Sequence, residues 1–206
     1  MFLKIALIAH IAAGSVSLVS GLLAIIFRKG FSAHKMAGSI YFFAMIFVCL
    51  SAISISLAKQ QSFLLHIGIF SGYLVYSGFQ AVKNKSYKPH VLDWVLLAIS
   101  LINAGFMILS MNIILLVFGG LGLILSMGDL RVFRMQIIKR EIPKSQWLVR
   151  HIGMMLGAYI STFTAFLVVN MTHVDYPVLI WLLPTMLGTP LIVFWTRKAV
   201  RTTPKS

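Results

Sequence analysis

The sequence predicts an all-α integral membrane protein, a bundle of seven transmembrane helices with the N-terminus outside and the C-terminus inside. Of the 206 residues, 59% are hydrophobic and only 11% are charged, whereas soluble domains carry about 25% charged residues. The hydrophobic residues form seven long runs, and a bilayer crossing needs about 20 apolar residues. These features exclude a soluble enzyme, a disordered chain and a disulfide scaffold, the last because Cys49 is the single cysteine.

We expect residues 1–206 to form one transmembrane domain. The first run is followed by Arg28 and Lys29 without a small-residue cleavage site, so it is interpreted as a retained helix and not as a signal peptide. In order, the expected spans are 3–27, 34–58, 63–82, 91–110, 113–130, 147–171 and 177–196.

The fourth and fifth spans are separated only by a short polar segment, because the stretch from Val91 to Met127 is almost unbroken. As one helix this stretch would be about 55 Å long at 1.5 Å per residue, nearly twice the hydrocarbon thickness of a bilayer. We therefore predict a tight turn near Ser110-Met111-Asn112 that divides it into two spans.

The charges agree with seven spans and fix the predicted orientation. Seven spans place sixteen of the eighteen Lys and Arg residues on one side and leave only Lys4 and Lys59 on the other. Six spans would move the loop 129–150, with six positive residues, to the opposite side. The excess of positive charge marks the inner side. We expect this charge to contact anionic lipids of the bilayer, with no nucleic acid as a partner.

The sequence also contains a candidate internal repeat. His10 and His34 are 24 residues apart, as are His66 and His90, and the segments HIAAGSVSLVSG and HIGIFSGYLVYSG begin at His10 and His66. This pattern suggests two parallel copies of a helical hairpin, residues 10–58 and 66–110.

The topology sorts the six histidines into two layers roughly 20 Å apart along the helices. His10 and His66 belong to the outer layer, with His173 in the outer loop. His34, His151 and His90 belong to the inner layer. The four acidic residues all lie near helix ends or in loops, which argues against an ion-coupled transporter, since such proteins keep ionisable residues along the pathway.

The leading hypothesis is a b-type haem protein that passes electrons across or along the membrane. Such a haem needs two imidazoles from different helices at one depth. His10 with His66 would ligate an outer haem, and His34 with His151 or His90 an inner one. Inner Lys and Arg residues would pair with the haem propionates, and a quinol is the expected electron donor. The arrangement is similar to that of di-haem cytochromes b.

Two other classes remain open. The first is a metal-dependent membrane hydrolase in which His34, His90 and His151 hold zinc with an open water position. The second is a non-catalytic accessory or assembly factor, in which the histidines only form hydrogen bonds between helices.

Four segments of the chain resemble a family of bacterial multi-pass membrane proteins that is described only as a domain of unknown function. These are Trp147–Asn170 (WLVRHIGMMLGAYISTFTAFLVVN) and Leu183–Trp195 (LPTMLGTPLIVFW), and more loosely His10–Gly21 and His34–Tyr41. The resemblance implies a bacterial plasma-membrane protein of about seven helices, without an assigned substrate or cofactor.

Overall fold

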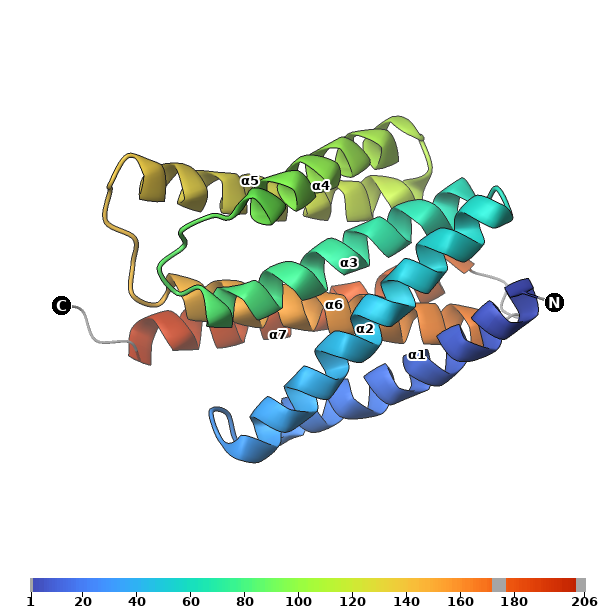
Figure 1. Ribbon diagram of the computed structural model, residues 1–206, viewed down its shortest axis with the longest axis horizontal. Coiled ribbons are helices and arrows are strands. Elements are labelled where there is room, and N and C mark those ends of the chain that lie inside the picture. Colours follow the sequence, from blue (N-terminus) through green and yellow to red (C-terminus); the bar gives the residue numbers. More distant parts are fainter. Residues whose placement is uncertain (1, 172–176, 203–206) are drawn as a thin grey trace.

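The computed structural model describes residues 2–171 and 177–202, and these residues form seven α-helices without a β-strand (Figure 1). All seven are long and apolar enough to cross a membrane, which confirms the predicted fold class. His173 and Asp175 lie outside the described residues. In chain order, the helices are α1 (Phe2–Ile26), α2 (Ser32–Ala58), α3 (Ser62–Lys83), α4 (Val91–Leu109), α5 (Ile113–Ile137), α6 (Gln146–Asn170) and α7 (Pro177–Thr202).

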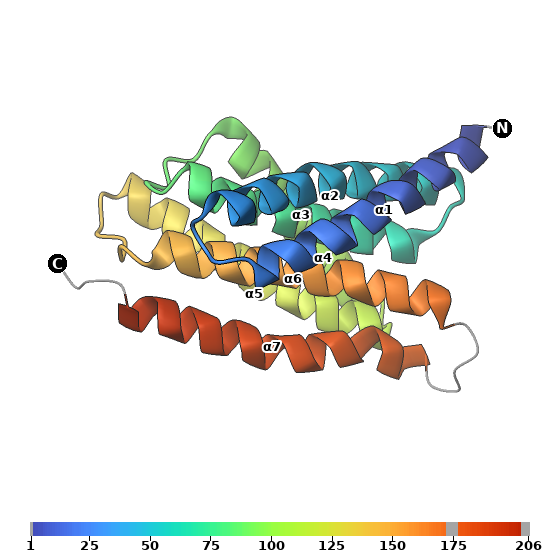
Figure 2. The ribbon, with the colours of Figure 1, turned by 90° about the horizontal axis from the view of Figure 1, so that it is seen from below.

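Helix α3 is the centre of the bundle. It packs against α2, α4, α5 and α6, whereas α1 packs mainly against α2 and α7 mainly against α6. Figure 2 shows α7 along one edge of the bundle. The side chains of Phe70, Leu74 and Val75 on α3 are all buried. Large apolar side chains on the outward faces of the other helices are exposed, among them Phe43 and Ile124, as expected where helices contact lipid.

The turn between α4 and α5 lies where the sequence predicts it. α4 ends at Leu109, and Met111 adopts a positive φ of 57°. Asn112 then caps α5, since its side-chain oxygen accepts hydrogen bonds from the backbone N–H groups of Ile114 (3.0 Å) and Leu115 (3.1 Å). The cap satisfies two of the free donors at a helix start, which stabilises the break between two apolar spans.

Two helices are longer than predicted. α5 continues to Ile137 instead of ending near residue 130, because Val132 and Phe133 are buried in the core while Arg131 lies on the exposed face. α7 continues to Thr202 instead of ending near residue 196, and its last turns carry exposed basic side chains. A hydropathy pattern ends where charges begin, whereas an amphipathic helix continues through them.

One end of the bundle gathers most of the positive charge. The loops 27–31, 84–90 and 138–145 lie at the same end as the C-terminal turns of α7, and the turns 59–61 and 110–112 lie at the other (Figure 1). We call the first the basic end and the second the opposite end. The clustering agrees with the predicted distribution of Lys and Arg between the two sides.

The capping role of Asn112 is testable by replacing it with alanine. We expect Asn112→Ala to lower the free energy of unfolding by about 1 kcal/mol, because two N–H groups at the start of α5 lose their acceptor. The loss is measured by thermal unfolding in detergent. Asn170→Ala is the matched control, since the exposed Asn170 side chain bonds only to a carbonyl of its own helix; an equal loss in the two variants would contradict the capping role.

Candidate functional site

A buried ion pair joins α5 to α6 near the basic end. The Nε of Arg150 lies 2.7 Å from Oδ1 of Asp129, and Nη2 of Arg150 donates a hydrogen bond of 2.8 Å to Oδ2. Both side chains are buried, and this is the one carboxylate–cation pair in the part of the chain that the structure describes. α5 and α6 do not otherwise pack against each other, so the ion pair bridges them directly.

Helix α3 completes the polar network around the carboxylate. The Tyr73 hydroxyl donates to Oδ2 of Asp129 at 2.6 Å. The Ser77 hydroxyl donates to the same oxygen at 3.2 Å and accepts from Nη2 of Arg150 at 3.3 Å. The Arg150 guanidinium also lies 5.4 Å from the ring centroid of Phe133. A charge pair is stable in apolar surroundings only when its remaining donors and acceptors are satisfied, and α3 supplies most of these partners.

The loop between α3 and α4 covers the network from the basic end. Tyr87 in this loop is buried, and its ring centroid lies 5.6 Å from the Arg150 guanidinium carbon, within range of a cation–π contact. Its backbone has a positive φ of 55°, which is uncommon for a residue with a large side chain. Burial raises the pKa of the Tyr87 phenol, so the group remains neutral beside the charge pair.

Sequence reasoning missed this network. It grouped Arg150 with the basic residues of the loop before α6 and placed Asp129 simply near a helix end. The available signal was the position of each residue: Asp129 lies within an apolar run of a chain with four acidic residues, and Arg150 lies inside the sixth expected span. Ionisable residues within a span are functional candidates by default, with each other as the first partners to consider.

The next residue along α6 belongs to a pair of histidines. Nδ1 of His151 lies 2.9 Å from the backbone oxygen of Gly78 on α3, and Nδ1 of His34 on α2 lies 2.8 Å from the backbone oxygen of Ala24 on α1. The two imidazole rings are 6.5 Å apart between centroids and nearly perpendicular. The structure therefore brings together the inner pair His34 and His151 that the sequence analysis named.

These hydrogen bonds determine which ring nitrogen carries the proton. A carbonyl oxygen can only accept, so Nδ1 is the protonated nitrogen in both rings. In the neutral imidazole, Nε2 then keeps an unprotonated lone pair. Two imidazoles on different helices thus have fixed tautomers, and the nitrogen that commonly binds a metal is left available in each.

The outer histidines are placed differently. Nδ1 of His10 lies 2.8 Å from the Ser51 hydroxyl on α2. Nδ1 of His66 lies 2.7 Å from Oδ1 of Asn103 on α4, and the amide of Asn103 donates back to the backbone oxygen of His66. Helices α1 and α3 do not pack against each other. Each histidine links the two helices of its own hairpin, and the expected pairing of His10 with His66 at an outer haem stays a prediction.

His90 lies apart from the other inner histidines. It is exposed at the N-terminus of α4, where its backbone N–H donates to Oδ2 of Asp93 at 2.8 Å. Helix α4 packs against α3 and α5, and His34, His90 and His151 do not form a three-histidine metal site in the described structure. The described residues contain no group of three or more His, Cys, Asp or Glu side chains that could hold a metal ion.

Small residues leave open space on α2 and α6, and also at Gly14 on α1. No atom of a neighbouring helix lies within 4 Å of where a Cβ would be at Gly38, one turn after His34, or at Gly153, two residues after His151. At Gly21, by contrast, a Cβ would lie 2.5 Å from the ring of Tyr159. The small-residue face of α1 is thus partly a packing surface for an aromatic side chain.

Comparison with known proteins places this chain in no family. No family model matches the chain, no curated protein matches it, and no solved structure matches it.

The energetic role of the buried ion pair is testable with single and double variants. Asp129→Asn and Arg150→Met should each lower the free energy of unfolding by about 3–5 kcal/mol, since each leaves one charge buried without its partner. The double variant Asp129→Asn/Arg150→Met should regain a large part of this loss, because no unpaired charge remains. Thermal unfolding in detergent measures all three.

Arg134→Met is the matched control, since Arg134 lies on the exposed face of α5, the helix that carries Asp129. It should change stability by less than about 0.5 kcal/mol. If the double variant loses as much free energy of unfolding as the two single variants together, the coupling between Asp129 and Arg150 is contradicted.

Proposed function

We propose that the protein is a small membrane redox protein that holds one b-type haem between His34 of α2 and His151 of α6. The observation that carries this proposal is the pair of imidazoles on different helices, each with Nδ1 bonded to a backbone carbonyl and Nε2 left available. Metal-binding histidines commonly donate their other ring N–H to a carbonyl or carboxylate, which fixes the ring and strengthens the ligand.

The spacing of the two rings fits such a group. Two imidazoles on opposite sides of a metal, with metal–nitrogen bonds of about 2 Å, have ring centroids roughly 6 Å apart. The His34 and His151 centroids are 6.5 Å apart. The open position at Gly38, one turn after His34, leaves room on the face of α2 that carries this ring. The donor set is therefore compatible with bis-histidine ligation.

Basic residues near His34 would pair with the carboxylates of the proposed haem. Lys29, in the loop between α1 and α2, donates to the backbone oxygens of Ala24 and Ile25, and the oxygen of Ala24 also accepts from His34. This shared acceptor places the ammonium close to the imidazole. Arg28 and Lys35 lie nearby in sequence and are exposed. We assign these residues to the propionates.

When bound, a haem of this type supplies one-electron transfer. The chain itself would bind and orient the group through His34 and His151. The ion pair between Asp129 and Arg150 would fix the position of His151, because Arg150 is the adjacent residue on α6. A membrane quinol remains the electron donor that we propose.

The first test is an absorbance spectrum of the detergent-purified protein, as isolated and after dithionite. We expect a Soret band and an α-band that sharpens on reduction, with one haem per chain. His34→Ala and His151→Ala should each remove the spectrum. His90→Ala is the matched control and should leave it unchanged, since His90 lies away from the pair. A colourless protein from haem-replete cells would overturn the proposal and favour the accessory-factor hypothesis.

We further propose that the protein resides in a bacterial plasma membrane with its basic end in the cytoplasm. The excess of Lys and Arg at that end supports this orientation. In a Cys49→Ser background, Gln61→Cys at the opposite end should react with a membrane-impermeant maleimide in intact cells. Lys88→Cys at the basic end should react only after lysis; the reverse pattern would show the opposite orientation.

A further inference from the structure

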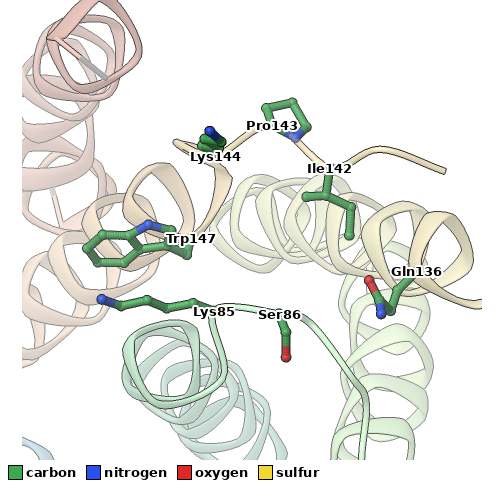
Figure 3. A pocket seen from close by; sticks show the side chains of 7 residues that line it. All are labelled: Lys85, Ser86, Gln136, Ile142, Pro143, Lys144 and Trp147. Atoms are coloured by element: carbon green, nitrogen blue, oxygen red, sulfur yellow. The ribbon is translucent and has the colours of Figure 1, made fainter. Parts of the chain in front are cut away.

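A pocket of about 550 Å³ opens at the basic end, between the α3–α4 loop, the α5–α6 loop and the ends of α5 and α6 (Figure 3). Lys85 and Trp147 lie side by side at one side of this pocket, Ser86 follows Lys85 along the same loop, and Gln136 lies across from Trp147. Lys144 lines it from the α5–α6 loop. Its polar side chains offer two ammonium groups, a hydroxyl and an amide, so hydrogen-bond donors predominate.

The two lysines are cations without a carboxylate partner among the described residues. The Lys85 ammonium lies 4.3 Å from the ring centroid of Trp147, and neither it nor Lys144 forms an ion pair in the described parts of the chain. No acidic side chain lines the pocket. Helix α6 begins at Gln146, beside Trp147, so its first N–H groups add a partial positive charge here.

We propose that this pocket binds a phosphate-bearing anion. Two lysines line one cavity that has no acidic side chain, which suits the binding of a phosphate group, and basic pockets between transmembrane helices bind anionic lipid headgroups. Trp147 lies in the first turn of a membrane-spanning helix, where an indole ring sits at the level of lipid headgroups. The same chemistry would serve a phospholipid headgroup or a soluble phosphate compound. The proposal is independent of the haem site.

Binding would link two loops that are far apart in the sequence. Lys85 comes from the loop that carries Tyr87, which covers the Arg150–Asp129 pair, and Lys144 comes from the loop that precedes α6. An anion held by both ammonium groups would draw the two loops together over the buried ion pair. Saturating ligand should therefore raise the melting temperature of the protein, because it binds only the folded state.

The experiment measures binding of short-chain phosphatidylglycerol to the full-length protein in a zwitterionic detergent, with phosphatidylcholine and inorganic phosphate as the other two probes. Native mass spectrometry counts the bound molecules, and the shift in melting temperature gives the affinity. We compare the wild type with Lys85→Ala/Lys144→Ala. Lys59→Ala/Lys198→Ala is the matched control, since it removes the same charge from exposed lysines that do not line the pocket.

We expect one saturable phosphatidylglycerol per chain, bound roughly thirty-fold more weakly by Lys85→Ala/Lys144→Ala and almost unchanged in the control. Competition by millimolar inorganic phosphate would support the anion site and assign it to a soluble ligand, whereas its failure to compete would assign the site to lipid. Equal binding by all three proteins, equal binding of phosphatidylcholine, or no saturable binding would overturn the proposal.

Discussion

The buried ion pair between Arg150 and Asp129 is the contact on which the arrangement of the bundle depends. Helices α5 and α6 do not pack against each other, and α3 lies against both. The long Arg150 side chain spans the gap, and Tyr73 and Ser77 of α3 satisfy the carboxylate. A charge pair in apolar surroundings tolerates little displacement, because each lost hydrogen bond leaves a buried charge less compensated. The pair therefore fixes the position of three helices at once.

The position of His151 follows from this constraint. Arg150 bonds to α5, while His151, the next residue, bonds to the backbone of α3 and lies beside His34 of α2. The first turns of α6 thus connect four helices near the basic end. An imidazole held on such a rigid segment is oriented before any ligand arrives, which is what a metal-binding or haem-binding site requires.

The sequence predicts the helices well because their length and hydropathy are local properties. The turn at Ser110-Met111-Asn112 follows from bilayer thickness alone, and it lies where expected. The continuation of α5 past residue 130 is not predicted by the same reasoning, because it depends on the burial of Val132 and Phe133 against other helices. Hydropathy places a residue along the membrane normal and contains no information about which helices become neighbours.

Hydropathy also does not show which histidines lie next to each other. Depth alone pairs His10 with His66 and His34 with His151 equally well. In the described part of the chain only the second pair is in ring contact, with centroids 6.5 Å apart. The partners of His10 and His66, Ser51 and Asn103, lie on the following helix of each hairpin. The sequence does not identify these partners in advance, because a single polar residue on an apolar helix forms no periodic pattern.

The order of the charged residues along the chain also has a consequence for biosynthesis. A single arginine is costly to transfer into a bilayer. Arg150 is synthesised 21 residues after Asp129, about the length of one transmembrane helix. The carboxylate and its partners on α3 therefore reach the membrane before the guanidinium does. When α6 leaves the translocation machinery, the carboxylate that pairs with Arg150 is already in the membrane. The guanidinium can therefore pair with it and does not have to enter lipid unpaired. Exchanging the two residues would reverse this order of arrival, and it would also remove the carboxylate that accepts from Tyr73 and Ser77.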